Sequence, residues 1–294
     1  MCRFVLYLGP ELTLSSLITE PSHSIVNQSF KSQEREEPVN GDGFGFAWWK
    51  HDLGARPGLF RSITPAWNNA NLLHLARLTR SCAIMAHVRA ATQITAVSEV
   101  NCHPFSAGPY AFMHNGDIGG FTRIRRAMLS RLTDESFGLI HGLTDSEHFF
   151  ALAMDALRHC GLADGGATAD DLGDALERAL GVALALGRDA GLDDHTYLNC
   201  AFSNGRTAAA VRFTTNDPKY AESLYLHRGR RYVCEGGVCR MLDPEEGHGA
   251  VIVASEPLSD DPGWESIPPN HVALISDSGS VNLRPFGVGQ LAGV

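Results

Sequence analysis

Runs of hydrophobic and polar residues predict strands, then helices, then strands again along this chain. Buried strands are predicted over residues 4–8 and 82–90, and a third over residues 109–114 runs into a glycine-bearing turn. Leucine and alanine at helical spacing predict helices over residues 68–80, 121–132, 144–160 and 169–188. From residue 196 onward, short apolar runs separated by turn residues indicate antiparallel strands. The order predicts an α+β fold with antiparallel sheets covered by helices, in one domain over residues 2–294.

Two segments lack this regular pattern. Residues 10–40 are mostly polar and show no clear period, so we predict an irregular segment there. Residues 40–50 (NGDGFGFAWWK) form a glycine-rich turn that leads into an aromatic strand. These glycines are not a phosphate loop, because GxxxxGK is absent and the turn precedes a strand rather than a helix.

Composition narrows the class of protein. The 33 acidic and 24 basic residues give a formal net charge of −9, which argues against a nucleic-acid partner. No apolar run approaches the ~20 residues of a membrane helix, and no signal peptide is evident. The seven cysteines are dispersed, and the closest pair, Cys234 and Cys239, lacks zinc-binding spacing. We therefore expect a cytoplasmic protein with free thiols, no membrane contact and no metal site.

Cys2 follows the initiator methionine directly. Aminopeptidases remove Met1 when the next side chain is small, which would leave a thiol and a free α-amine on one residue. The thiolate is the reactive form of cysteine, and an α-amine with a reference pKa of about 7.7–8.0 can act as its base. The alternative is that Cys2 only begins a strand.

Four further positions carry candidate chemistry. Arg89 ends a buried strand and needs an anion, either a substrate or a structural ion pair. The amide of Asn115 and the backbone N–H of Gly116 could form an oxyanion hole or an ordinary turn. His103 is either a loop histidine with a structural role or a catalytic one, and Asp145 is either a ligand or a helix cap.

In their order, these residues resemble the class II glutamine amidotransferases, the N-terminal-nucleophile family. The resemblance rests on MCRF at the start, AHVRAATQ (86–93), NCHPF (101–105), FMHNGDI (112–118) and TDSE (144–147). It implies a four-layer αββα sandwich with antiparallel sheets and with the cysteine at the end of a central strand.

The same resemblance implies a role for each matching residue. Cys2 attacks the amide with its own amine as base, and Asn115 and Gly116 form the oxyanion hole. The substrate-binding residues are Arg89 for the α-carboxylate with Thr92 beside it, Asp145 for the α-ammonium, and His103 near the site. Ala90 stands where the sugar-phosphate-forming members carry a tryptophan in the loop that closes over glutamine. The resemblance therefore does not imply how this loop closes here.

Within the family the chain resembles stand-alone members: the amidotransferase-type subunit of the glutathione-degrading complex and, more distantly, the ergothioneine-pathway γ-glutamyl hydrolase. The resemblance implies hydrolysis of a γ-glutamyl amide, such as a glutathione-like peptide, without a cofactor. The alternatives are a glutaminase that supplies ammonia to a separate synthase, and a non-catalytic subunit that binds γ-glutamyl ligands. A peptidase-like or synthase subunit is the expected partner. Residues 22–38 and Trp48, Trp49 and Trp67 are candidates to border a pocket for the leaving group. The alternative is that the tryptophans belong to the core, as we expect for at least one of Trp48 and Trp49, which occupy adjacent strand positions.

Overall fold

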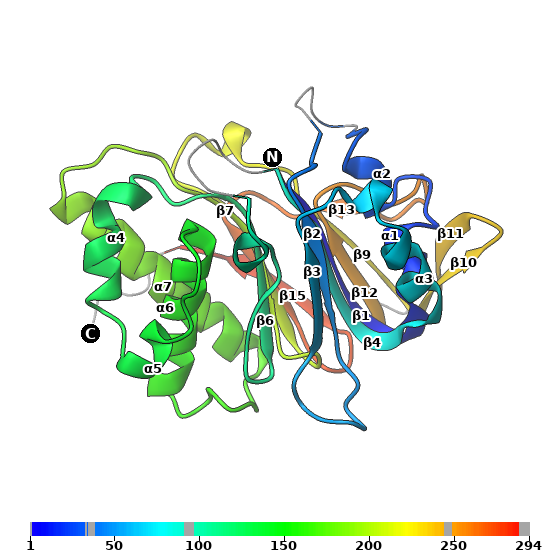
Figure 1. Cartoon of the computed structure of the whole chain (residues 1–294), viewed down its shortest axis with the longest axis horizontal. Helices are drawn as coiled ribbons and strands as arrows, with labels where there is room; N and C mark the ends of the chain where they lie inside the picture. Colours follow the sequence, from blue (N-terminus) through cyan, green and yellow to red (C-terminus); the bar gives the residue numbers. More distant parts are fainter. Residues whose placement is uncertain (1, 33, 35–38, 91–96, 244–248, 288–294) are drawn as a thin grey trace.

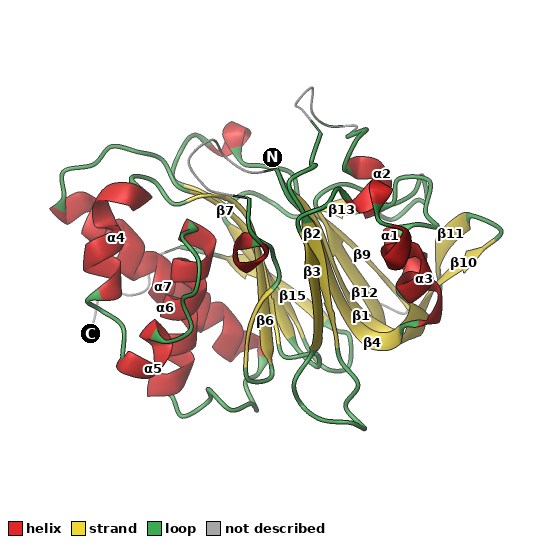
Figure 2. Ribbon diagram, viewed as in Figure 1, coloured by secondary structure: helices red, strands yellow, loops and turns green. Residues whose placement is uncertain are grey.

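The computed structural model describes residues 2–32, 34, 39–90, 97–243 and 249–287. Two large sheets face each other, and helices cover the outer face of each sheet (Figures 1 and 2). All strand pairings in both sheets are antiparallel. The predicted α+β fold and the four αββα layers are confirmed.

The first sheet contains the strand that follows Cys2. Its order is β13-β9-β12-β1-β4-β2-β3, so β1 lies at the centre. The strands are β1 (Arg3–Thr13), β2 (Phe44–Trp48), β3 (Gly58–Ser62), β4 (Arg80–Val88), β9 (Tyr225–Gly229), β12 (Ala250–Ala254) and β13 (Glu265–Ser266). A separate hairpin consists of β10 (Arg231–Glu235) and β11 (Val238–Leu242).

The second sheet has the order β15-β14-β8-β7-β6-β5. Its strands are β5 (Phe105–Ala107), β6 (Tyr110–Asp117), β7 (Tyr197–Ser203), β8 (Ala208–Thr214), β14 (His271–Ile275) and β15 (Val281–Pro285). Asn115 and Gly116 belong to β6, where they pair with Asn199 and Leu198 of β7. The predicted turn at these two residues is therefore wrong, because the ladder with β7 continues through them.

The helices divide between the two outer faces. The short helices α1 (Ser15–Ile18) and α2 (Ile25–Gln28), the turn η1 (Ala66–Asn68) and α3 (Ala70–Leu78) lie on the first sheet (Figure 1). The second sheet is covered by α4 (Phe121–Leu129), α5 (Asp134–Phe137), α6 (Asp145–His159) and α7 (Ala169–Asp189). Two further short turns are η2 (Glu99–Asn101) and η3 (Pro218–Tyr220). No described helix is both long and apolar enough to cross a membrane.

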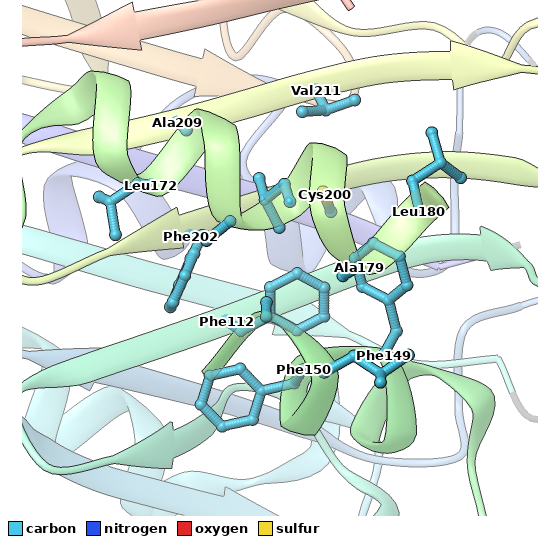
Figure 3. Close-up of a cluster of buried hydrophobic side chains, with 14 of the residues drawn as sticks. Phe112, Phe149, Phe150, Leu172, Ala179, Leu180, Cys200, Phe202, Ala209 and Val211 are labelled. Carbon is cyan, nitrogen blue, oxygen red and sulfur yellow. The ribbon is translucent and has the colours of Figure 1, made fainter. Parts of the chain in front are cut away.

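Three apolar layers separate these elements. In β1, Val5 and Tyr7 join the core under α1–α3, whereas Phe4 and Leu6 join the core between the sheets. This alternation places Cys2, one position before the strand, on the face that looks toward the second sheet. Figure 3 shows the third layer, in which aromatic rings of the second sheet pack against α6 and α7. The site at Cys2 therefore lies between two rigid sheets.

Two further predictions differ from the structure. The segment 10–40, expected to be irregular, contains the end of β1 and two four-residue helices, which are too short to show a period. Cys234 and Cys239, expected to be free, form a disulfide, because the Gly236-Gly237 turn places them directly opposite each other in the β10–β11 hairpin. The described free cysteines are Cys2, Cys82, Cys102, Cys160 and Cys200.

Candidate active site

Cys2 directly precedes the central strand β1, and its thiol is held by the backbone of Ala90. The Ala90 N–H donates to Sγ at 3.4 Å, and Sγ lies 3.5 Å from the Ala90 carbonyl oxygen. Burial raises the pKa of the Cys2 thiol, and this effect outweighs the opposing effects of the Ala90 N–H and of the Arg89 and Arg3 charges. A protonated thiol in this position needs a base before it can attack a substrate.

Asn115 connects the two sheets at this point. Its Nδ2 donates to the Cys2 carbonyl oxygen at 2.9 Å and to Ser255 Oγ at 3.1 Å. Its Oδ1 lies 3.0 Å from His87 Nε2, so that nitrogen carries the proton and donates. Because both amide hydrogens are engaged, a substrate oxyanion would have to replace one of these two acceptors. The oxyanion role of Asn115 stays a prediction.

Gly116 occupies a place that no other residue could take. Its φ is +144°, and a Cβ built on it would lie 1.9 Å from the carbonyl oxygen of Tyr197. The strand β7 therefore runs against the Gly116 backbone, directly beside Asn115. Only glycine permits this close approach of two backbones.

Arg89 directly follows β4 and is 4% exposed. Its backbone is fixed by Gly43 and Asp42: the Arg89 N–H donates to Gly43 O at 2.8 Å, and Asp42 N–H donates to Arg89 O at 3.0 Å. The guanidinium is close enough to the nucleophile for its charge to lower the pKa of the Cys2 thiol in part. The predicted partner Thr92 lies outside the described residues.

His103 lies one step further from the nucleophile. Its ring stacks on His87 at a centroid distance of 4.2 Å, and the edge of Phe105 lies at 4.6 Å. Burial, followed by the neighbouring charges, lowers its pKa well below the usual histidine value, so the ring is neutral. The structure therefore links His103 to Cys2 through His87 and Asn115, without a direct contact between the two residues.

Asp145 is the first residue of α6, but it is not the cap of that helix. The cap is Thr144, whose Oγ1 accepts from Glu147 N at 3.2 Å. The Asp145 carboxylate accepts from Ile118 N at 2.9 Å and from Ser146 N at 2.8 Å. Through its bond to Ile118, two residues after Gly116, Asp145 joins the start of α6 to the end of β6. The bond places a carboxylate at this end of the strand.

A second carboxylate, Asp117, lies beside this anion. Asp117 is exposed by accessible area, but partial desolvation of its carboxylate, followed by the negative charges of Asp145 and Asp194, raises its pKa to about 6. Like charges in one place disfavour the ionised form of each. The end of β6 is therefore a negatively charged region that would stabilise a bound cation.

Sequence reasoning missed the network around Arg3. Arg3 Nη1 donates to the Cys2 carbonyl oxygen at 2.9 Å, Nη2 donates to Ser32 Oγ at 2.7 Å, and Nε pairs with Glu256 Oε1 at 2.6 Å. The buried pair of charges ties the nucleophile to the segment after α2 and to the segment after β12. The sequence signal that could have predicted this pair is a charged residue next to a buried strand, which is Arg3 in MCRF and Glu256 in ASEPL.

No group of three or more potential metal ligands occurs among the residues that the structure describes. The arrangement suits an acyl-transfer site: a thiol, neutral hydrogen-bond donors, the buried cations Arg89 and Arg3, and a group of anions. Such a set can hold an amino-acid head group and attack a carbonyl.

Comparisons with known proteins agree with this arrangement. A model of the class-II glutamine amidotransferases matches residues 13–232, a range that includes Arg89, Asn115 and Asp145 but begins after Cys2. A probable glutamine amidotransferase, DUG3 of Saccharomyces cerevisiae, is 39% identical over 97% of this chain and 84% of its own length. The γ-glutamyl-hercynylcysteine sulfoxide hydrolase of Mycolicibacterium smegmatis is 26% identical over 95% of this chain and 97% of its own.

Solved structures extend the comparison. A glutamine aminotransferase class-II domain protein from Silicibacter pomeroyi has a TM-score of 0.66 and 28% identity, covering 97% of this chain and all of that chain. The phosphoribosylpyrophosphate amidotransferase of Bacillus subtilis has a TM-score of 0.58 and 14% identity over half of its length, which shows the shared fold alone. The chain belongs to the class II glutamine amidotransferases, N-terminal-nucleophile enzymes of the kind that hydrolyse amide bonds.

Proposed function

We propose that this enzyme hydrolyses the γ-glutamyl amide bond of a γ-glutamyl compound through a thioester on Cys2. The observation that carries the proposal is the surroundings of Cys2: the Asn115 amide donates to its carbonyl oxygen, and the Arg89 cation is near enough to lower the thiol pKa in part. The carboxylate of Asp145 accepts from Ile118 N, just after the strand that contains Asn115. The name of the M. smegmatis relative, a γ-glutamyl-hercynylcysteine sulfoxide hydrolase, supports this class of substrate, and the name of the yeast relative supports a glutamine-type amide.

The reaction divides into two acyl transfers. After Met1 is removed, the α-amine of Cys2 takes the thiol proton, and Sγ attacks the γ-carbonyl carbon. The oxyanion accepts hydrogen bonds from the Asn115 amide and the Gly116 N–H. The α-ammonium then protonates the leaving amine as the C–N bond breaks. Water attacks the thioester, glutamate leaves, and the thiol regains its proton.

The head group is held by opposite charges at the two ends of the site. The guanidinium of Arg89 binds the α-carboxylate, while Asp145 binds the α-ammonium. The predicted role of Thr92 in binding the same carboxylate falls outside the described residues. Arginine matches a carboxylate well because its planar donors can bind both oxygens. His103 acts as a neutral support behind His87, which in turn holds the Asn115 amide.

The leaving group is larger than ammonia in this proposal. The rings of Phe30 and Trp67 lie edge to face at 6.0 Å and are 50% and 40% exposed. A Cβ on Gly41 would lie 3.1 Å from the Trp67 ring, and the following residue, Asp42, donates to the Arg89 carbonyl oxygen. This exposed aromatic pair therefore borders the segment that fixes Arg89, where it can contact a bulky leaving group.

The other two tryptophans do not border such a pocket. Trp49 is 1% exposed and its Nε1 donates to Pro109 O at 3.0 Å, whereas Trp48 packs on Phe46 at 5.4 Å in the core under α1–α3. The alternative, that these tryptophans belong to the core, applies to Trp49 directly after β2, whereas Trp48 at the end of β2 is half-buried against the core under α1–α3. Trp67 is the remaining candidate.

Partners and location stay predictions. The resemblance implies a peptidase-like or synthase partner subunit, and the cytoplasm is the expected compartment. The hydrolysis as written uses side chains, the α-amine and water. The two alternatives, a glutaminase that supplies a separate synthase and a non-catalytic γ-glutamyl-binding subunit, differ from the proposal in substrate preference and in turnover.

The experiment is a comparison of kcat/KM for glutamine, glutathione and a panel of γ-glutamyl amides, with and without candidate partner subunits. Cys2→Ala serves as the inactive reference. We expect a γ-glutamyl compound larger than glutamine to have the highest kcat/KM, because contacts with the leaving group made in the transition state raise it. Preference for glutamine throughout would support the glutaminase, and no turnover of any compound would support the binding subunit.

A matched pair of variants tests the aromatic border. Trp67→Ala should lower kcat/KM for the preferred large substrate while leaving that for glutamine nearly unchanged. Leu53→Ala removes a hydrophobic side chain that is 86% exposed in the β2–β3 connection and should change neither. Equal losses for large and small substrates in Trp67→Ala would remove this residue from the leaving-group pocket.

A further inference from the structure

A small polar cavity lies beside the nucleophile. Cys2, Asn115, Asn199, Ser255 and Glu222 are among the residues that line it, and its volume is about 10 Å³. That is enough room for roughly one group of the size of a water molecule or an amine. The cavity is therefore a place where a small polar group next to Cys2 could be bound.

Asn199 supplies an unused acceptor in the wall of this cavity. The residue lies within β7, is 2% exposed, and its Nδ2 donates to Glu222 O at 3.2 Å and to Ser223 O at 2.9 Å. These two bonds to carbonyl oxygens fix which atom of the amide is nitrogen and which is oxygen. Oδ1 is buried and accepts no hydrogen bond from the described residues. A buried acceptor in this state calls for a donor.

Ser255 cannot be the main acceptor of the cavity. Its Oγ already accepts from Phe4 N at 3.0 Å and from Asn115 Nδ2 at 3.1 Å. A hydroxyl oxygen has two lone pairs, so both are in use. Asn199 Oδ1 is thus the neutral acceptor with free capacity in this wall.

Maturation of the chain creates a matching donor. Removal of Met1 turns the peptide nitrogen of Cys2 into a primary amine, whose protonated form carries three N–H groups. We propose that Asn199 Oδ1 accepts a hydrogen bond from the α-ammonium of mature Cys2, which makes Asn199 a positioning residue for the catalytic base. The inference rests on the proposed function, since it requires a free amine at Cys2.

The chemical consequence concerns how strongly the amine holds its proton. A hydrogen bond to the charged form stabilises that form, and a neutral amide does so less than a carboxylate would. Asn199 therefore orients the amine and leaves it able to release its proton to the leaving group. Charged or titratable groups on the surrounding elements also contribute to the electrostatic environment of the amine. These groups are Arg3 of β1, His87 of β4, Arg89 after β4, Arg212 of β8, Glu222 before β9 and Glu256 after β12.

Two variants separate this role from a structural one. Asn199→Leu and Asn199→Asp both remove the amide donors to Glu222 O and Ser223 O, but only aspartate keeps an acceptor oxygen. A merely structural role would be lost in both variants alike. A role toward the amine predicts opposite effects, because leucine cannot stabilise the ammonium and a carboxylate stabilises it more than the native amide.

The measurement is an NMR titration of the mature enzyme labelled with [2-13C]cysteine. The Cys2 signal, one of seven cysteine signals, is identified by its loss in Cys2→Ser, and its shift with pH reports the ionisation of the adjacent amine. We expect the titration midpoint to rise by about one pH unit in Asn199→Asp and to fall by roughly half a unit in Asn199→Leu. If Asn199→Leu does not fold, the rise in Asn199→Asp decides alone.

Two outcomes would overturn the inference, and they are distinguishable. If Met1 is absent and the Cys2 amine titrates, but its midpoint is unchanged in Asn199→Asp or moves in the same direction in both variants, Asn199 does not contact the amine and the proposed function stands. If intact mass shows that active enzyme retains Met1, there is no amine to bind, and both the inference and the proposed mechanism fail.

Discussion

Burial raises the pKa of the Cys2 thiol, whereas the Ala90 N–H and the charges of Arg89 and Arg3 oppose this shift without cancelling it. The thiol is therefore mainly protonated near neutral pH and needs a base within reach. The neighbouring histidines cannot serve: burial lowers the pKa of His87 to about 3, and the ring is engaged with Asn115. At the scale of single residues, the α-amine of Cys2 itself is the base that the mechanism requires.

Asn115→Ala tests the oxyanion hole. The change should lower kcat by roughly 10²–10³-fold with little change in KM, because such donors act mainly in the transition state. Steady-state kinetics measures the split, and thermal unfolding checks that the variant is folded, since His87 loses its partner. A variant that keeps kcat and loses only KM would show that Asn115 binds substrate uniformly.

Asp117→Asn tests the negative region at the end of β6. The folded-state pKa of about 6 is above the ordinary aspartate value, so the ionised side chain destabilises the fold at neutral pH. The variant should unfold roughly 1–2 °C higher than the wild type near pH 7.5. This gain should shrink as pH falls through 6 and vanish below the unfolded-state pKa, where the native carboxyl is neutral in both states. A gain that is independent of pH would contradict the assignment.

Helix α6 begins with two neighbouring residues that have separate tasks. Thr144 caps the helix by accepting from Glu147 N, whereas the Asp145 carboxylate accepts from Ile118 N at the end of β6. A sequence pattern of Thr-Asp-Ser-Glu predicts a helix start but cannot say which side chain caps it. At the scale of the element, the structure leaves Asp145 free of the capping role and joins its carboxylate to the end of β6.

Asp145→Ala and Thr144→Ala form a matched pair for this element. Loss of one partner of a desolvated charge pair costs about 2–5 kcal/mol, so Asp145→Ala should lower kcat/KM by roughly 30-fold or more. Thr144→Ala should instead lower the free energy of unfolding by about 1 kcal/mol and leave the kinetics close to wild type. Chemical denaturation and kinetics on both variants make the comparison. If Asp145→Ala melts the protein and spares kcat/KM, its carboxylate is only structural.

Elements with a clear hydrophobic period could be predicted from the sequence, and others could not. The helices at 121–132, 144–160 and 169–188 correspond to α4, α6 and α7, because each buries a long apolar stripe on the second sheet. The helices α1 and α2 were missed because four residues cannot show a period. Asn115-Gly116 was placed in a turn because the sequence cannot show that β7 pairs with it.

At the scale of the whole molecule, the site exists because two sheets pack face to face and Cys2 precedes a central strand of the first sheet, on the side that faces the second. Asn115 of the second sheet donates hydrogen bonds to Cys2 and to Ser255, which follows β12 of the first sheet. Both partners are more than a hundred residues away in the sequence. The residue types could be listed from the sequence and the family resemblance. The Arg3–Glu256 pair, the Asn199 acceptor and the Cys234–Cys239 disulfide depend on long-range pairing or a hairpin register, and so were found only in the structure.

The measurement that tests the central claim most directly is intact-protein mass spectrometry of the active enzyme after reaction with a glutamine-analogue electrophile, followed by peptide mapping. The account predicts a chain that starts at Cys2, a single label on Cys2 with the other cysteines spared, and loss of both label and turnover in Cys2→Ala. Full activity with Met1 retained, or a label on Cys82 or Cys102 instead of Cys2, would contradict the account.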